Sequence, residues 1–279
     1  MLSKAQIKFI QSLRIKKFRE EHNSFLAEGE KLAEELLSST VIIKDIYATE
    51  HWLNGNHKKI KKETGLHSVS EGELKRISSL STPNEVLIVA ETPMQKLWLK
   101  HLPEELSLVL DDIRDPGNLG TIIRVADWFG IKNIICSNET ADAFNPKVVQ
   151  ATMGSVIRVN VFYSDLVSFF REPDLKGIPV YGALLEGENI YKSKLSATGL
   201  ILIGNESRGI SKELLPFISK KINIPPFGPS TSSGQVLSPT LSPSTNDQGK
   251  AGEGKRSGAE SLNAAVAAAV ICSEFRRAC

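Results

Sequence analysis

Apolar residues along this chain fall in short blocks that alternate between the spacing of strands and the spacing of helices. Largely aliphatic runs at 85–90, 106–110 and 200–203 predict strands buried on both faces. Helical spacing of apolar residues predicts helices at 30–37 and 119–129. Further strands are predicted at 41–47, 66–69, 132–136, 158–162, 178–185 and 221–224, and further helices at 1–20, 70–78, 145–154, 165–170, 212–217 and 264–275. This order predicts an α/β fold with a mostly parallel sheet covered on both sides.

The length and local composition predict two domains. At 279 residues the chain is long for one domain and suits two. Residues 96–104 are the predicted linker between a domain at 1–95 and a second domain at 105–279. Residues 228–258 are dominated by Ser, Thr, Pro and Gly. Such a segment cannot bury enough apolar surface to offset its ordering entropy, which predicts a disordered insertion.

The charge pattern allows a nucleic-acid partner without requiring one. The formal net charge is only +2, so affinity for a polyanion must come from local clusters of the 34 Lys and Arg. Residues 1–20 predict a basic amphipathic helix, and a second basic cluster lies at 57–62. Each cluster fits a solvated surface or a phosphate-contacting face, and their occurrence in one small module modestly favours a polyanion partner.

Cysteine, apolar and histidine content exclude several classes of protein. The three cysteines are widely spaced, which is typical of a reducing compartment. No apolar run approaches the roughly 18–20 residues that span a bilayer, so the expected location is the cytoplasm, with no membrane partner. All five histidines lie within the first 101 residues. A zinc site or a Ser-His-Asp triad is therefore not expected in the second domain, and no metal is predicted.

Two strand ends carry candidate site residues. The strand at 200–203 stops at Gly204, which is followed by polar side chains, and ligands of open α/β sheets bind beyond the carboxyl ends of strands. The strand at 106–110 leads into a turn, where Asn118 is predicted to cap the next helix beside amides suited to an anion. Position alone favours a structural salt bridge for Arg124, further along that helix.

Two common nucleotide-binding classes do not fit. The chain has no G-x-G-x-x-G fingerprint after its first strand and no G-x-x-x-x-G-K-[ST] loop. A Rossmann dehydrogenase and a P-loop NTPase are therefore excluded.

Three segments, in the same order along the second domain, closely resemble the signature motifs of the SpoU/TrmH family of RNA ribose 2′-O-methyltransferases. They are Asn118-Leu119-Gly120 with Arg124, then Gly204-Asn205-Glu206-x-Arg208-Gly209, then Ile224-Pro225 with Ser261-Leu262-Asn263. Residues 1–95, which include Glu28-Gly29 and Ser81-Thr82-Pro83, look like the substrate-binding domain of this family, a small α/β/α unit. The resemblance covers the chain except for residues 228–258.

The resemblance implies more than the residues alone predict. It implies a SPOUT domain with a C-terminal trefoil knot, a topology that general rules disfavour, and a homodimer formed through that domain. It implies S-adenosylmethionine as the cofactor, bound by Gly204, Ile224 and Leu262. The implied substrate is a ribose 2′-hydroxyl of rRNA or tRNA, with rRNA favoured. The implied catalytic residues are Arg124, Asn118, Glu206, Ser261 and Asn263.

The implied chemistry limits what Arg124 does. Methyl transfer from a sulfonium needs an aligned hydroxyl oxygen and removal of its proton. A guanidinium is hardly ever deprotonated in proteins, so we favour Arg124 as a cation that holds the target phosphate and stabilises the developing alkoxide. For Glu206 and Asn263, a purely structural role in the loops stays open.

One departure from the family leaves alternatives open. Relatives have only a few residues between the segments that correspond to Pro225 and Ser261, whereas this chain carries the predicted insertion there. If the insertion disturbs the cofactor site, the chain is an RNA-binding protein that has lost methyl transfer. A methyltransferase acting on a small molecule or a protein is a third class, which the lysine clusters disfavour.

Overall fold

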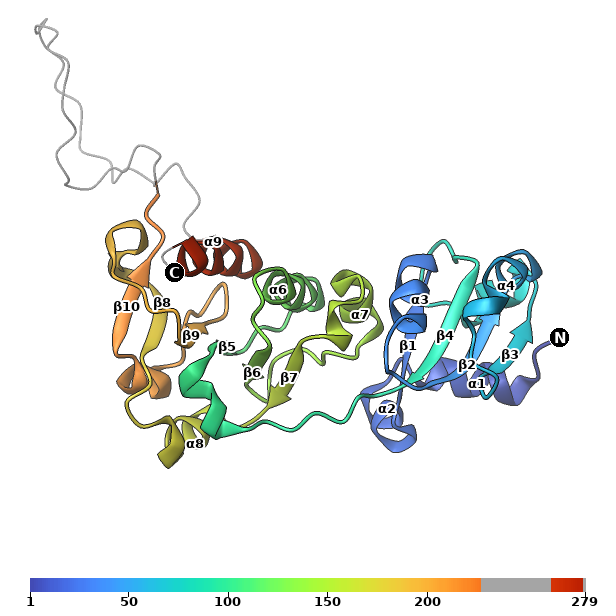
Figure 1. Cartoon of the computed structure of the whole chain (residues 1–279), viewed down its shortest axis with the longest axis horizontal. Helices are drawn as coiled ribbons and strands as arrows, with labels where there is room; N and C mark the ends of the chain where they lie inside the picture. The colour runs from blue at the N-terminus through green and yellow to red at the C-terminus, as the bar shows by residue number, and fades with distance from the viewer. Residues whose placement is uncertain (227–261, 278–279) are drawn as a thin grey trace, which may run out of the picture.

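The structure is a computed structural model that describes residues 1–226 and 262–277. It contains two sheets, one on each side of the segment 92–105 (Figure 1). The predicted insertion at 228–258 and Ser261 lie outside the described residues. The α/β class predicted from the sequence is confirmed.

The smaller sheet has four strands in the order β1-β4-β2-β3 and mixed pairing. Its strands are β1 (Ser24–Glu28), β2 (Ile43–Ala48), β3 (Gly65–Ser68) and β4 (Val86–Glu91). Strand β4 pairs antiparallel with β1 and β2, while β2 and β3 are parallel. The helices around it are α1 (Lys4–Ser12), α2 (Lys16–His22), α3 (Glu30–Leu37), α4 (Glu50–Asn56) and α5 (Glu71–Ile77). Of these, α4 was not predicted.

The prediction of one basic helix over residues 1–20 is wrong, because the chain forms two helices with a break between Leu13 and Ile15. Two of its cations also have internal partners. Arg14 donates to the carbonyl oxygens of Ile77 and Ser78, and Arg19 is only 4% exposed. These two guanidinium groups are structural rather than part of a phosphate-contacting face.

The two sheets belong to units that pack directly on each other. Arg19 forms a buried ion pair with Asp142, which lies beyond the segment 92–105 in the chain. The rings of Phe25 and Phe144 lie 5.0 Å apart between centroids. Removing one partner of a buried ion pair leaves an uncompensated charge, which costs about 3–5 kcal/mol. The ion pair and the ring contact therefore both lie in the interface between the two units.

A second interdomain contact centres on Arg158. Its Nη1 donates to Glu35 Oε2 at 2.5 Å, and its Nη2 donates to Asp127 Oδ2 at 2.8 Å. Burial alone would raise the pKa of Asp127, but hydrogen bonds from Arg158 and Ser155 and the charge of Arg158 lower it below the usual range. Arg158 thus joins α3 of the smaller unit to the larger unit.

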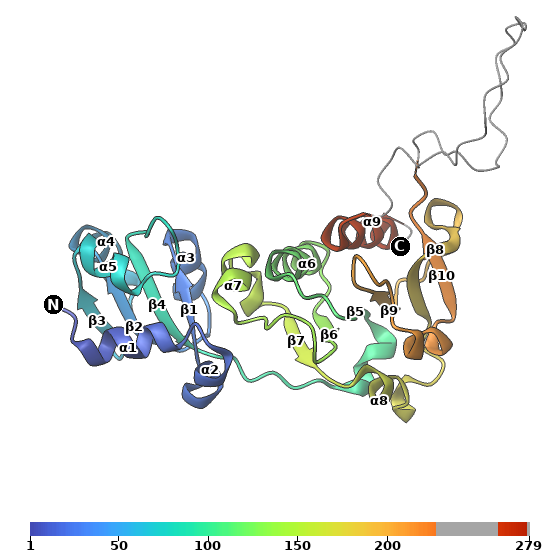
Figure 2. The ribbon, with the colours of Figure 1, turned by 180° about the vertical axis from the view of Figure 1, so that it is seen from behind.

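The larger sheet has six strands in the order β10-β8-β9-β5-β6-β7, and every neighbouring pair is parallel. Its strands are β5 (Leu106–Leu110), β6 (Asn133–Cys136), β7 (Asn160–Tyr163), β8 (Val180–Asn189), β9 (Gly199–Ile203) and β10 (Lys220–Asn223). Its helices are α6 (Pro116–Trp128), α7 (Pro146–Thr152), α8 (Leu166–Phe170) and α9 (Ala264–Arg277), with a 3-10 helix at Lys212–Phe217 where a helix was predicted. Helices α6, α7 and α9 lie along one side of the sheet and α8 lies on the other (Figures 1 and 2).

Both faces of this sheet are buried, as the aliphatic runs predict. Along β9, Ile201 and Ile203 pack into the core shared with α6 and α9, while Leu200 and Leu202 pack into the core shared with α8. All four are at most 3% exposed. A strand buried on both faces needs apolar residues at every position, which explains the continuous run.

Helices α6 and α7 pack closely because Gly120 has no side chain. A Cβ at this position would lie 2.5 Å from Cβ of Ala151 and 2.9 Å from the carbonyl oxygen of Val148. The glycine of the first motif is therefore required by helix packing.

We expect Gly120→Ala to lower the free energy of unfolding by about 1–3 kcal/mol, because the added methyl group overpacks the α6–α7 contact. Gly55→Ala is the matched control, since Gly55 is also helical but a Cβ there has no neighbour within 4 Å. The control should be neutral or stabilising by up to about 1 kcal/mol. Urea denaturation of both variants measures the difference, and equal stabilities would contradict this account of Gly120.

Candidate active site

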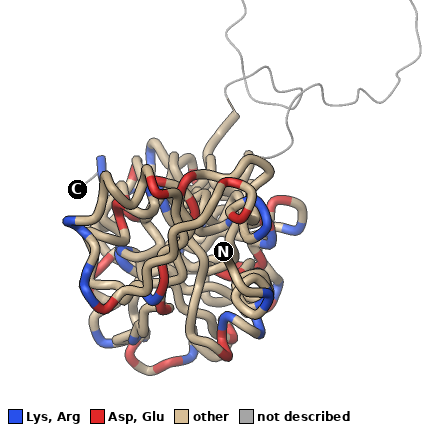
Figure 3. Tube along the Cα trace, turned by 90° about the vertical axis from the view of Figure 1, so that its right-hand side faces the viewer, with Lys and Arg blue, Asp and Glu red and all other residues tan. Residues whose placement is uncertain are grey.

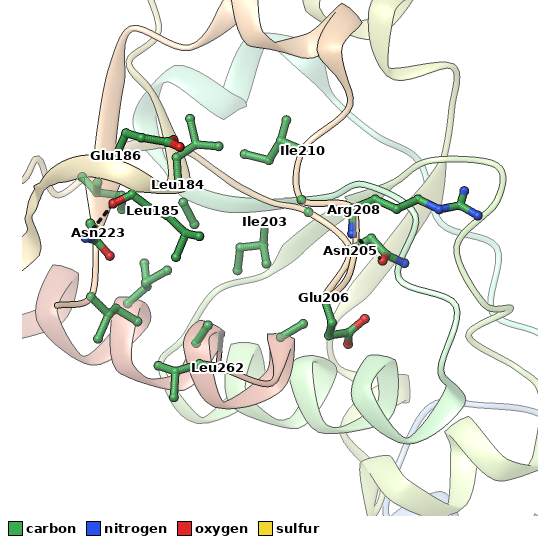
Figure 4. Close-up of a pocket in the computed structure, with 18 of the residues that line it drawn as sticks. Leu184, Leu185, Glu186, Ile203, Asn205, Glu206, Arg208, Ile210, Asn223 and Leu262 are labelled. Atoms are coloured by element: carbon green, nitrogen blue, oxygen red, sulfur yellow. Dashed lines mark hydrogen bonds between the residues drawn. The ribbon is translucent and has the colours of Figure 1, made fainter. Parts of the chain in front are cut away.

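A cavity of about 410 Å³ lies where the carboxyl ends of β9 and β10 meet α9. It is bounded by the loop 204–209, by β8 and by the first turns of α9 (Figure 4). The residues that line it are Ala183, Leu184, Leu185, Glu186, Ile190, Ile203, Gly204, Asn205, Glu206, Ser207, Arg208, Gly209, Ile210, Leu215, Ile222, Asn223, Ile224, Leu262, Ala264, Ala267 and Ile271. Gly204, Ile224 and Leu262, the three residues predicted to bind the cofactor, therefore lie in the wall of one cavity.

Three side chains form a hydrogen-bonded cluster at the edge of this cavity. Asn118 Nδ2 donates to Glu206 Oε1 at 2.5 Å, and Asn263 Nδ2 donates to Asn118 Oδ1 at 2.8 Å. Asn118 thus uses its amide nitrogen toward one motif and its amide oxygen toward another. Residues from the start of α6, the loop after β9 and the start of α9 meet at this point. We call Asn118, Glu206 and Asn263 the amide cluster.

The helix caps leave the Asn118 side chain available for this cluster. The prediction that Asn118 caps α6 is wrong, because Asp115 is the N-cap and its Oδ1 accepts from the backbone N–H of Asn118 at 2.8 Å. Asn263 takes the capping role at α9, where its Oδ1 accepts from the N–H groups of Ala265 and Val266.

Position 204 requires a glycine because the backbone of Gly209 and Ile210 passes close to its Cα atom. A Cβ at Gly204 would lie 2.3–2.4 Å from backbone atoms of Gly209 and Ile210. The loop closes with a pair of backbone hydrogen bonds between Asn205 and Gly209. The absence of a side chain at Gly204 therefore lets the loop pass close to its backbone.

Arg124 lies away from the amide cluster of its own chain. It is exposed, does not line the cavity, and has no hydrogen bond or ion pair with another described residue. The salt bridge favoured from its position is therefore wrong. Six residues along a helix correspond to about 9 Å and a turn of about 120° from Asn118, so the two side chains leave α6 on different faces.

The sequence predictions assigned no role to several polar residues of the cavity. Glu186 follows the predicted strand 178–185, and Asn223 ends β10. The rule that polar residues after strand ends are site candidates would have found Glu186 from the predicted strand, although in the structure β8 continues to Asn189. It would not have found Asn223, which lies inside the predicted strand 221–224. Asn205 donates from Nδ2 to the carbonyl oxygen of Asp112 at 2.8 Å, which ties the loop after β9 to the loop after β5. Nothing in the sequence identifies that partner.

The structure gives two further negative findings for residues 1–226 and 262–277. Within these ranges there is no group of three or more His, Cys, Asp or Glu side chains arranged to hold a metal ion. No helix in the same ranges is both long enough and apolar enough to cross a membrane.

A parallel-sheet α/β unit with a cavity beyond its strands and a second unit packed against it defines a class of ligand-binding enzyme. Residues 105–233 match the SpoU rRNA Methylase family, and residues 4–88 match the MRM3-like substrate binding domain. The chain is 30% identical over 274 residues to the 23S rRNA (guanosine(2553)-2'-O)-methyltransferase RlmP of Bacillus subtilis (strain 168), covering 97% of this chain and 96% of the relative. The chain therefore belongs to the SpoU rRNA methylase family.

Solved structures agree with this assignment. A protein of the TrmH family from Porphyromonas gingivalis matches with a TM-score of 0.80 and 35% identity, covering 99% of each chain. The AdoMet-bound rRNA methyltransferase from Sinorhizobium meliloti matches with a TM-score of 0.77 and 29% identity, covering 99% of this chain and 97% of the other. The similarity therefore includes both units of the chain.

We expect Asn118→Asp to make stability depend on pH, because it places a second carboxylate against Glu206. Two carboxylates at hydrogen-bond distance cannot both be ionised without repulsion, so the pKa of the pair rises in the folded state. A raised folded-state pKa favours folding at low pH and loses that contribution as pH rises through it. Relative to wild type, the variant should lose about 1.4 kcal/mol of stability for each unit of pKa shift between acidic and neutral pH. Denaturation of the variant and of wild type at several pH values measures this difference. Asn118→Ala is the control, which should lack the added pH dependence. If stability varies with pH in the same way in Asn118→Asp and in wild type, the two carboxylates do not lie within hydrogen-bond distance.

Proposed function

We propose that this protein is an S-adenosylmethionine-dependent methyltransferase that modifies a ribose 2′-hydroxyl in rRNA. The observation that carries the proposal is the amide cluster at the edge of a cavity whose wall includes Gly204, Ile224 and Leu262. Relatives support the substrate, since RlmP is named as a 23S rRNA 2'-O-methyltransferase. The rRNA substrate in turn supports a location in the cytoplasm.

The residues of the cavity fit the proposed cofactor. Its volume of about 410 Å³ lies within the range of about 300–1,000 Å³ typical of small-molecule sites. Its wall is largely aliphatic, with Ile203, Ile224 and Leu262 around it and polar groups confined to a few positions such as Asn205 and Glu206. Bound S-adenosylmethionine supplies the electrophilic methyl group. The chain supplies an apolar enclosure and a polar edge at which a hydroxyl is held.

The RNA-binding alternative without methyl transfer has less support. It required that the residues between Pro225 and Ser261 separate the two halves of the cofactor site. Ile224 and Leu262 nevertheless line the same cavity, so both halves of its wall are present.

The amide cluster is proposed to position the substrate rather than to remove its proton. Asn118 is held by Glu206 on one side and by Asn263 on the other, which fixes the direction of its amide. Ser261 belongs to the same motif as Asn263 and is proposed to complete the site. Arg124 is proposed to hold the target phosphate and stabilise the developing alkoxide.

The position of Arg124 supports a homodimer in which each active site uses the Arg124 of the partner. Arg124 does not line its own cavity, and it lies on an exposed face of α6 that also carries Trp128. Trp128 is 84% exposed and Val266 of α9 is 49% exposed, so each leaves apolar surface in contact with water. Burial of this face of α6 and α9 in a symmetric interface removes both from water. The trefoil knot stays an expectation from the family, because residues 227–261 connect β10 to α9 and lie outside the described residues.

Arg124→Ala should lower methyl transfer at least ~100-fold, the typical effect of removing one group that stabilises developing negative charge. S-adenosylmethionine binding should stay within about twofold of wild type, since Arg124 does not line the cavity. Mass mapping of ribose methylation in an unmodified 23S rRNA transcript measures the transfer, and calorimetry measures cofactor binding. Retained turnover would remove Arg124 from the reaction, and a wild-type protein that neither binds the cofactor nor methylates rRNA would overturn the proposed function.

Mixed dimers test whether Arg124 acts in the active site of the partner subunit or in that of its own subunit. Arg124→Ala and Glu206→Gln homodimers should each be inactive. A heterodimer of the two, isolated with two different affinity tags, has one complete site only if Arg124 acts across the interface, and it should recover about half of wild-type activity. An inactive heterodimer, with cofactor binding intact in its Arg124→Ala subunit, would show that Arg124 serves its own subunit. Light scattering supplies the control that the heterodimer stays assembled.

A further inference from the structure

The loop after β5 contains a carboxylate that is shared by two arginines. Asp112 Oδ1 accepts from Arg114 Nε at 2.5 Å, and Asp112 Oδ2 lies 3.6 Å from Arg208 Nη1. Arg114 belongs to the loop after β5, and Arg208 belongs to the loop after β9. Because β5 and β9 are neighbouring parallel strands, with Leu110 opposite Ile203, the two loops leave the sheet side by side.

Asp112 is held in an unusual conformation by several hydrogen bonds. Its φ angle is +58°, in the left-handed region that residues other than glycine rarely adopt. Its N–H donates to Ser137 Oγ at 3.0 Å, and its carbonyl oxygen accepts from Asn205 Nδ2 at 2.8 Å. Asn205 Oδ1 in turn accepts from the backbone N–H of Arg208 at 3.2 Å. Local strain of this kind persists where surrounding contacts fix it, and it is common at functional sites.

The two guanidinium groups stay exposed although their shared partner does not. The side chain of Asp112 is 14% exposed, whereas those of Arg114 and Arg208 are 56% and 70% exposed. Exposed ion pairs add only about 0–1 kcal/mol to stability, so stability alone does not account for the arrangement. Asp112 and the two guanidinium groups together carry a net charge of +1, and Glu139 also interacts electrostatically with Arg114. Among the described residues, no acceptor is hydrogen bonded to Nη1 or Nη2 of either arginine.

The arginine pair lies next to the proposed reaction centre. Arg208 follows Glu206 by two residues, and Arg114 precedes Asn118 by four, while Asn118 and Glu206 are hydrogen bonded to each other. Figure 4 shows the side chain of Arg208 extending away from the cavity, beyond Asn205. In the view of Figure 3, Lys and Arg positions are interspersed with Asp and Glu, so binding of a phosphate depends on local groups rather than on a whole-molecule field.

We propose that Arg114 and Arg208 form a binding site for a phosphodiester of the RNA strand that carries the target ribose, with Asp112 as its positioning residue. The proposal rests on the proposed function, since it assigns a substrate contact at the same active site. Planar guanidinium groups bind phosphate oxygens through paired hydrogen bonds, and Asp112 holds both groups close together through one hydrogen bond and one ion pair. A phosphate held here fixes the strand beside the amide cluster.

The experiment measures methylation kinetics and RNA binding for single variants, with an unmodified 23S rRNA transcript as the probe. Arg114→Ala and Arg208→Ala should each raise the KM for the transcript about 5- to 10-fold. For Arg114→Ala, kcat and S-adenosylmethionine affinity should change by less than about twofold, because Arg114 does not line the cavity. Both variants should also reduce the slope of log binding constant against log salt concentration by about one. Arg208→Lys, which keeps the charge but loses the planar fork, should restore the slope and only part of the KM. Arg171→Ala is the matched control, because Arg171 is an exposed arginine that follows α8.

Asp112→Asn separates positioning from charge. Asparagine also tolerates the left-handed conformation, so the backbone should keep its path while the guanidinium groups lose their anchor. We expect kcat/KM to fall while the salt slope does not, since no cation is removed. A reduced salt slope in Asp112→Asn would assign the residue to something other than positioning.

Two results overturn the proposal. An unchanged KM and salt slope in both arginine variants would show that neither arginine contacts the phosphate backbone. Loss of cofactor affinity in Arg114→Ala would make the role of Arg114 structural, because Arg114 does not line the cavity. If wild-type protein transfers no methyl group to the transcript, the proposed function fails. The salt dependence of transcript binding then still decides the phosphate site, because it is measured without turnover.

Discussion

The site depends on the two hydrogen bonds made by the side-chain amide of Asn118. This amide donates to Glu206 and accepts from Asn263, so one side chain joins three segments that are distant in the sequence. A carboxamide does both at once with a defined direction, whereas an ionised carboxylate lacks the donor and an apolar residue lacks both groups. The caps follow from this constraint. Asp115 caps α6 in place of Asn118, and Asn263 uses Oδ1 for its own helix and Nδ2 for the cluster.

The sequence predicts the frame of the molecule because the larger sheet is buried on both faces. Burial on both faces demands aliphatic runs such as 200–203, and those runs are visible without any tertiary information. The same logic finds Gly204 and Glu206, which follow a strand end. Helix α4 was missed because Asn54 and Gly55 are poor helix formers. Its stability comes from the Thr49 cap and the buried Trp52, and those contacts are tertiary as much as local.

The sequence alone does not show which residues distant along the chain pair with each other. Arg19 and Arg124 look alike, since each is a cation within an amphipathic helix. In the structure Arg19 is buried against Asp142, whereas Arg124 is exposed and unpaired among the described residues. The difference is set by which surface packs on each helix, which periodicity cannot show. The family resemblance predicted a role for Arg124 that position alone did not, and the exposed Trp128 on the same helix face is consistent with a second subunit there.

The long interval between the two halves of the cavity wall is energetically tolerable. Residues 225–261 separate Ile224 from Leu262, a connection of 37 residues. Each doubling of a flexible loop costs only about 0.6 kcal/mol, so three doublings beyond a connection of about five residues cost about 2 kcal/mol. Helix α9 offsets this through Ile271 and Phe275, which are at most 1% exposed, because burying each such side chain contributes about 1.5–3 kcal/mol. Docking of α9 therefore keeps Leu262 and Asn263 at the site, so the length of the insertion does not by itself argue against activity.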